Sequence, residues 1–223
     1  MSQHTTPPTT PRPLLRGYSH AVAAVVAVGG VPLLLRIADG DPRKQLALAV
    51  YALSTVLLFA CSALYHTLPL PPRRHALLRR LDHAVIFVMI AGAYTPIAYT
   101  LLAGWWRVSL CGAVWGVAVL GVTAVAAPRP VSRRIRVGLY LVLAWLTVLV
   151  SPTILLPLGF SDLRLPLLGG VLFMAGMFVY ASRRPLLWPR VFGYHELFHL
   201  AVVGGNVAFF LFMAQYIAPA SPV

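Results

Sequence analysis

Long apolar runs alternate with short polar segments along most of the chain. Each run is close to the roughly 20 residues that an α-helix needs to cross the hydrocarbon core of a bilayer. The runs are continuous and lack the two-residue alternation that is typical of barrel strands. The pattern predicts an all-α integral membrane protein, a seven-transmembrane-helix bundle whose spans are roughly Tyr18–Leu35, Leu46–Leu68, His83–Ala103, Val108–Ala126, Val137–Leu158, Leu165–Ala181 and Tyr194–Ile217.

Short segments flank this bundle at both ends. Residues 1–13 are rich in Thr and Pro and lack an apolar core, so a disordered N-terminal tail is expected and not a cleavable signal peptide. Residues 14–218 form the predicted transmembrane domain, and residues 219–223 a short C-terminal tail. Inside the domain, glycines in the fourth and sixth spans suit close helix packing, namely Gly112, Gly116, Gly169, Gly170 and Gly176.

The formal net charge of +13 could indicate nucleic-acid binding, but the basic residues are gathered in short loops between apolar runs. In membrane proteins such clusters set the topology and meet anionic lipid head groups. We therefore expect membrane lipids as partners, with anionic head groups at the arginine-rich loops, and no nucleic acid. Of the 18 Lys and Arg residues, all but Arg36, Arg43, Lys44, Arg107 and Arg164 fall on one side of the predicted topology. The positive-inside rule then places the N-terminus in the cytoplasm and the C-terminus outside.

Two histidines, His195 and His199, stand four residues apart at the head of the last span. On a helix they share one face, about 6 Å apart along the axis, and zinc is the commonest metal bound by such a pair. With Glu196 they also spell the HExxH signature of soluble zinc proteases, in which the Glu is the general base. The spanning sequence that follows argues against that class. Histidines that only hydrogen-bond between helices are the alternative to a metal site.

Other polar residues are expected at the same depth. Ser62 and His66 share a face at the end of the second span, and Asp82 opens the third. The predicted topology brings both ends to the cytoplasmic leaflet, where the last span begins. His66, His195, His199 and Asp82, the last directly or through a water, make a set suited to zinc with one exchangeable position.

These polar residues also have simpler interpretations. Asp82 could cap the third helix, and Ser62 could be a packing serine. His20 lies at the cytoplasmic end of the first span and could contact the metal ligands from outside. His83 points about 100° away from Asp82 around the helix and is expected to meet a neighbouring helix or the interface. Glu196 is rotated off the face of the two histidines, and a part in proton transfer stays open.

From about Leu14 onward the chain resembles the hemolysin III proteins, bacterial relatives of the adiponectin and progestin receptors in an alkaline ceramidase-like superfamily. The resemblance is carried by Ser62-x-x-x-His66, by Leu81-Asp82 with Gly92 and Pro96 further along, and by His195-x-x-x-His199. It implies zinc held by the three histidines near the cytoplasmic face, with Asp82 on a metal-bound water and Ser62 beside the site. It also implies a multi-pass protein of the plasma membrane, the inner membrane of a bacterium.

The sequence departs from that family at two places. Arg16 stands where an Asn is expected before Ser19-His20, and Phe209 stands where many members have a further histidine. Neither departure removes a residue of the predicted metal set. Both bear on the role of the first helix and on details of the substrate.

Three functions are compatible with these residues. In a zinc-dependent hydrolase acting on an amide or ester of a membrane lipid, Asp82 would be the general base and Ser62 would hold or polarise the substrate carbonyl. In a receptor or a membrane-lipid homeostasis factor, zinc would be structural and no turnover would occur. A pore-forming cytolysin is the third, and it is the least supported because few polar residues line the middle of the spans.

Overall fold

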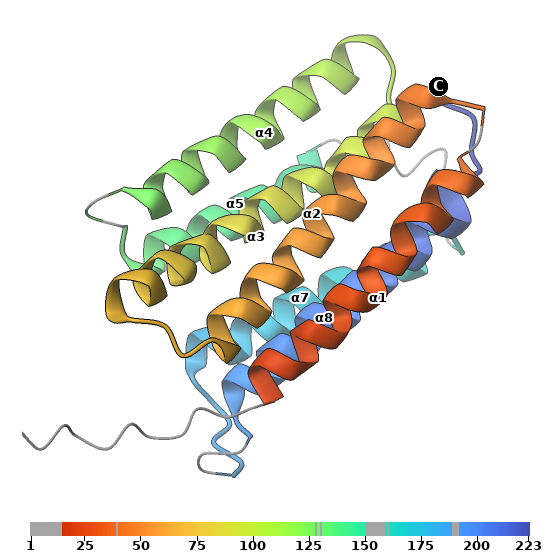
Figure 1. Ribbon diagram of the computed structural model, residues 1–223. Helices are drawn as coiled ribbons and strands as arrows, with labels where there is room; N and C mark the ends of the chain where they lie inside the picture. Colours follow the sequence, from red (N-terminus) through yellow and green to blue (C-terminus); the bar gives the residue numbers. More distant parts are fainter. Residues whose placement is uncertain are drawn as a thin grey trace, which may run out of the picture.

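The computed structural model describes residues 15–38, 40–127, 129, 131–149, 159, 161–188 and 192–223. Within these ranges the fold is helical, and the only β-pairing is an isolated bridge between Trp188 and Phe192. The helices run up and down in a bundle (Figure 1). They are α1 (Leu15–Ile37), α2 (Pro42–Thr67), α3 (Pro72–Leu101), α4 (Gly104–Ala126), α5 (Arg133–Leu149), α7 (Arg164–Ser182) and α8 (Tyr194–Phe212), which a π-helical turn, η1 (Met213–Ile217), extends.

Six of the described helices are long and apolar enough to cross a membrane: α1, α2, α3, α4, α7 and α8 with its extension. The fifth predicted span, Val137–Leu158, is described only as far as Leu149. Its second half lies outside the described residues. For the described residues the prediction of an all-helical fold is therefore confirmed, with six helices that could cross a membrane and the 17 described residues of α5. The count of seven spans and the orientation of the termini stay predictions.

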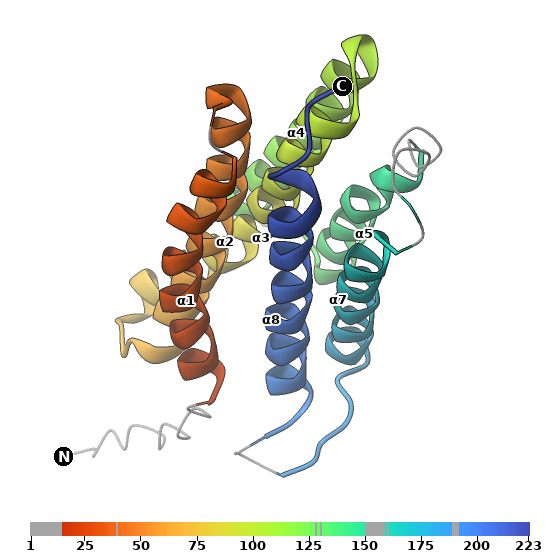
Figure 2. The ribbon, with the colours of Figure 1, turned by 90° about the vertical axis from the view of Figure 1, so that its right-hand side faces the viewer.

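Consecutive helices are antiparallel neighbours, so each end of the bundle collects alternate helix ends. α2 packs between α1 and α3, α3 also packs on α4, and α8 packs on α7 and α1 (Figure 2). We call one end the histidine end: it contains the starts of α1, α3, α5 and α8 and the ends of α2, α4 and α7. Residues far apart in the sequence meet there.

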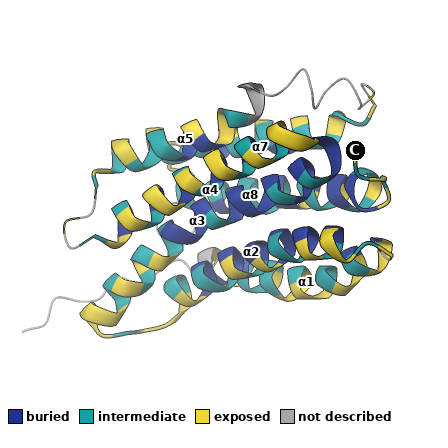
Figure 3. Ribbon diagram, turned by 90° about the horizontal axis from the view of Figure 1, so that it is seen from above, coloured by how far each residue is buried: buried dark blue, intermediate teal, exposed yellow. Residues whose placement is uncertain are grey.

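Exposed and buried positions divide as expected for helices surrounded by lipid. Large apolar side chains on the outer faces are exposed, for example Val25 and Phe178, each with 74% of its surface accessible. Buried positions gather on the faces of α2, α3 and α8 that turn inward (Figure 3). In a bilayer the outward apolar side chains meet lipid tails, so the helices are held together by close packing and internal polar contacts.

Two details of the predicted spans are wrong. The third helix begins at Pro72, about three turns before the apolar run that starts near His83. Its first turns are arginine-rich, so the apolar pattern did not include them. Long Arg side chains can keep their charge in the head-group region while the stem lies along the helix. Gly112, Gly116 and Gly170 make no close approach, because a Cβ added at any of them would meet no heavy atom within 4 Å. Gly169 and Gly176 do pack tightly, against Phe209 and Ala201 of α8.

Residues 219–223, predicted as a short tail, lie against the helix ends opposite the histidine end. The Nζ atom of Lys44 donates to the carbonyl oxygen of Ala220 at 3.1 Å, and the Val223 N–H donates to that of Thr100 at 3.1 Å. Arg107 donates to the carbonyl oxygen of Val223 at 2.8 Å. These bonds cover the ends of α2, α3 and α4.

The close approach of α2 and α3 at Gly92 gives a test of the packing. A Cβ at Gly92 would lie 2.9 Å from the Cβ of Ser54 and 3.3 Å from the Val50 carbonyl oxygen, both rigid neighbours. We expect Gly92→Ala to lower the free energy of unfolding by about 1–3 kcal/mol, measured by thermal unfolding in detergent. Gly116→Ala is the matched control, with an unchanged or slightly raised Tm. Equal Tm values for the two variants would contradict this packing.

Candidate metal centre

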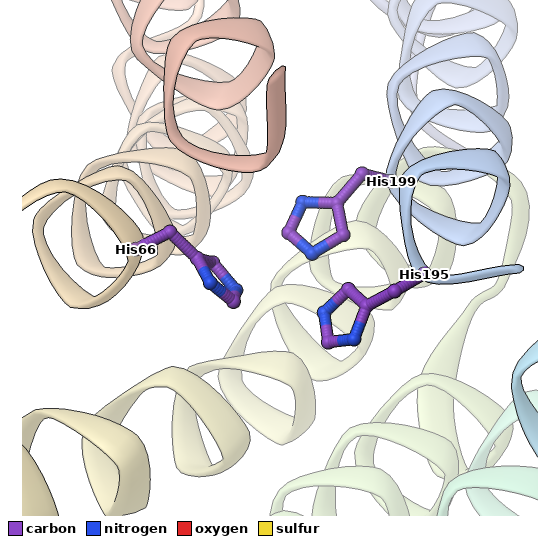
Figure 4. A group of neighbouring side chains, drawn as sticks. All are labelled: His66, His195 and His199. Carbon is purple, nitrogen blue, oxygen red and sulfur yellow. The ribbon is translucent and has the colours of Figure 1, made fainter. Parts of the chain in front are cut away.

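Three histidines from two helices meet at the histidine end of the bundle. His66 comes from the last turn of α2, and His195 and His199 come from the first two turns of α8. One ligand atom from each ring lies within 4.8 Å of those of the other two. The ring centroids are 4.8 to 5.2 Å apart, and the rings turn toward a common point (Figure 4). The structure thus brings together the three histidines that the sequence predicts to converge.

The three rings are buried to different depths. His199 is only 2% exposed, whereas His66 and His195 are partly exposed. His195 lies one helical turn nearer than His199 to the start of α8, so the cluster opens toward the histidine end. On the inner side, an apolar cluster formed by Leu58, Phe59, Val85 and Met89 packs against α1, α7 and α8. The histidines therefore lie between this apolar cluster and the histidine end of the bundle.

The start of α8 is fixed by Glu196. The Gly193 N–H donates to Oε2 of Glu196 at 2.8 Å, and Glu196 is 3% exposed. A Glu three residues after the N-cap that reaches back to the cap N–H is one half of a capping box. Glu196 thus has a structural role: it holds the first turn of the helix that carries both His195 and His199. The position of Glu196 off the face of His195 and His199 agrees with the prediction from the helical period.

Ser62 and Asp82 are joined to each other. The Ser62 side chain, 3% exposed, hydrogen-bonds to the Asp82 carboxylate, which links α2 to α3. Asp82 is not one of the residues whose ligand atoms lie within 4.8 Å of one another. It does not cap α3 either, because that helix begins ten residues earlier at Pro72. Its carboxylate also interacts electrostatically with Arg136 of α5.

His20 of α1 lies directly beside the cluster. Its ring centroid is 4.0 Å from that of His199 and 5.1 Å from that of Phe59. The sequence placed His20 at the depth of the other histidines, and the structure adds the contact with His199. His83 is outside the group: its Nδ1 lies 2.5 Å from the Arg79 carbonyl oxygen of its own helix.

Several residues around the centre were missed by the sequence analysis. The Tyr180 ring of α7 is 5.9 Å from that of His195, and Arg133 of α5 stacks on Tyr180 with its Cζ 4.3 Å from the ring centroid. Tyr140 donates to the His83 carbonyl oxygen at 2.6 Å. Arg133 and Arg136 are spaced i, i+3 at the start of α5, which puts both on one face. That spacing is the feature of the sequence that could have indicated a shared role for the two arginines.

The donor set fits zinc. Three imidazoles within reach of one point, with few other donors at that point, make the type of site in which zinc keeps a fourth position for water or substrate. Zinc–nitrogen bonds are about 2.0–2.1 Å long, so nitrogens around one ion would lie somewhat closer together than the 4.8 Å limit observed here.

A family profile for proteins described as "Haemolysin-III related" matches residues 9–210. The chain belongs to this haemolysin III-related family. Among curated relatives, "Hemolysin-3" from Bacillus cereus is 27% identical over 205 residues, covering 90% of each chain. The "Hemolysin-3 homolog" from Bacillus subtilis (strain 168) is 27% identical over 202 residues, covering 89% of this chain and 91% of that relative. The resemblance noted from the sequence motifs is therefore confirmed over almost the whole chain.

The cluster predicts how this haemolysin III-related protein binds metal. Purified without chelator, the wild type should carry about one zinc per chain, measured by mass spectrometry of the released metal. Substituting Ala for His66, His195 or His199 should remove most of it, because two remaining imidazoles bind weakly. His83→Ala is the control and should keep full occupancy. Retained stoichiometric zinc in the His199→Ala variant would argue against this centre.

Proposed function

We propose that this protein is a zinc-dependent hydrolase that cleaves an amide or ester of a membrane lipid at the cytoplasmic leaflet. The observation that carries the proposal is the three-histidine cluster at one end of an apolar, membrane-spanning bundle. Three imidazoles leave room for a fourth ligand, which is the arrangement of catalytic zinc sites. The partial exposure of His66 and His195 supports access from the histidine end.

The proposed orientation follows from the distribution of charge. Most of the 18 Lys and Arg residues belong to segments at the histidine end or to the N-terminal segment that precedes α1. The positive-inside rule then assigns the histidine end to the cytoplasm of a multi-pass plasma-membrane protein. The same arginines would attract anionic head groups, each worth about 1 kcal/mol near the surface. An amphiphilic substrate would reach the centre from that leaflet.

The chain's own residues have separate tasks in this proposal. A zinc ion held by His66, His195 and His199 would polarise a carbonyl and lower the pKa of a bound water to about 7. Asp82 would accept the proton from the attacking water and return it to the leaving group. Ser62, hydrogen-bonded to Asp82, would hold that carboxylate or orient the substrate carbonyl. The positive charge of Arg136 would interact favourably with the carboxylate of Asp82.

A second candidate, a receptor or lipid-homeostasis factor with structural zinc, also has an observation in its favour. α2 packs mainly on α1 and α3, whereas α8 packs mainly on α7. A metal bound by His66 and the two histidines of α8 would cross-link these two groups of helices. In that case removal of zinc would lower the Tm strongly, and no substrate would be turned over.

Turnover separates the two candidates. Zinc-loaded wild type would be offered a panel of ceramides, acyl amides and lipid esters, and released fatty acid would be measured. We expect hydrolysis that His66→Ala abolishes and that Asp82→Asn lowers by about 10²- to 10⁴-fold, the range typical of a lost general base. Ser62→Ala should reduce the rate less, because Asp82 remains.

The controls for this assay come from the same chain. His83→Ala should retain wild-type turnover, since its ring bonds within its own helix. Wild type that carries zinc but releases no more fatty acid than His66→Ala would contradict the hydrolase. A large fall in Tm on chelation of that same inactive protein would then support the structural role.

A further inference from the structure

His20 is a buried imidazole that touches the metal centre from a third helix. It lies in the second turn of α1 and is 3% exposed. Its ring tilts by 39° against that of His199 at a centroid distance of 4.0 Å, and it makes a T-shaped contact with the Phe59 ring at a centroid distance of 5.1 Å. Neither ring nitrogen has a hydrogen-bond partner of normal distance and angle among the described residues, although the backbone of His199 lies close to the ring.

Burying the His20 imidazole would be energetically costly if the ring only packed against its neighbours. A buried polar group without a hydrogen bond costs about 1–3 kcal/mol, and an apolar ring of similar size would fill the space without that cost. The surroundings are apolar: Phe59 belongs to the cluster with Leu58, Val85 and Met89. An imidazole at this position therefore indicates a polar partner at the cluster beside it.

The same geometry limits what that partner can be. His20 is not among the residues whose ligand atoms all lie within 4.8 Å of one another. A first coordination sphere of four histidines is therefore not what the structure holds. Groups that hydrogen-bond to a metal's ligands, without binding the metal, raise its affinity by fixing the ligands in place.

We propose that His20 is a positioning residue of the metal centre: through a ring nitrogen it hydrogen-bonds to His199 or to the non-protein ligand and so strengthens zinc binding. The proposal rests on the metal site of the proposed function, and it does not require turnover. It gives α1 a direct share in the centre, so that α1, α2 and α8 all contribute to the binding of one ion. It also gives a physical reason for a polar ring deep in the α1 interface.

The test separates the ring nitrogens from the ring itself. His20→Phe keeps an aromatic ring against Phe59 and His199 and removes both nitrogens. His83→Phe makes the same change outside the cluster and is the matched control. Zinc affinity would be measured by competition with a chromophoric chelator on the purified full chain, and Tm would be measured with zinc and with excess chelator.

We expect His20→Phe to bind zinc about 10- to 100-fold more weakly than wild type, the usual effect of losing a partner of a metal ligand. In chelator, the same variant should be as stable as wild type or more stable, because a buried polar group has been removed. His20→Gln, which keeps a side-chain donor and acceptor, should recover part of the affinity. His83→Phe should bind like wild type.

Three results would overturn the proposal. Wild-type zinc affinity in His20→Phe would show that the ring only packs. A lower Tm of His20→Phe in chelator, with its zinc affinity equal to that of wild type, would show a structural role. Wild type that binds no zinc would overturn both this inference and the proposed function. If zinc binding weakens in His20→Phe but the protein hydrolyses no lipid, the positioning role of His20 would be supported and only the hydrolase would be contradicted.

Discussion

The constraint on which this molecule depends is the convergence of several imidazoles at one end of an apolar bundle. Polar groups in a membrane protein must find partners inside the protein, because lipid offers none. Here three rings from α2 and α8 bring their ligand atoms within 4.8 Å of one another. A cation would satisfy all three at once, which no arrangement of neutral rings does as fully, since each neutral imidazole has one donor and one acceptor.

The surrounding structure is arranged to keep that point in place. Glu196 fixes the first turn of α8 by accepting the Gly193 N–H, so the two histidines of that helix begin from a defined geometry. Ser62 precedes His66 by one turn and ties α2 to α3 through Asp82. Behind the rings, Phe59 and its apolar neighbours close the interior. Three separate contacts therefore position the cluster before any metal binds.

Much of this architecture can be predicted from the sequence by the helical period and the length of the apolar spans. The i, i+4 spacing of His195 and His199 and of Ser62 and His66 fixes which side chains share a face, and the alternation of spans fixes which helix ends meet. That is why His66 could be matched to a pair about 130 residues away. The start of α3 could not be placed in this way, because the arginine-rich turns from Pro72 resemble a loop in composition while forming a helix.

Contacts that depend on rotation about the helix axes were beyond sequence reasoning. Period alone puts Gly112 and Gly116 on one face of α4, but it does not say which face meets a neighbour, and a Cβ at either would meet no heavy atom within 4 Å. For the same reason the Ser62–Asp82 bond, the Arg136 charge beside it and the contact of His20 with His199 required the structure. Each of these contacts joins residues whose depth in the bundle could be predicted from the sequence, whereas the direction in which their side chains point could not.

The gradient of exposure across the three rings bears on what the centre can do. A structural zinc site is closed by four protein ligands, and its metal is shielded from exchange. In this protein the inner ring, His199, is 2% exposed, while His66 and His195 remain partly exposed toward the helix ends. Asp82, which interacts with Ser62, is not part of the histidine group. Three imidazoles, two of them partly exposed, leave a fourth coordination position for an exchangeable ligand, and the proposed hydrolase rests on that arrangement.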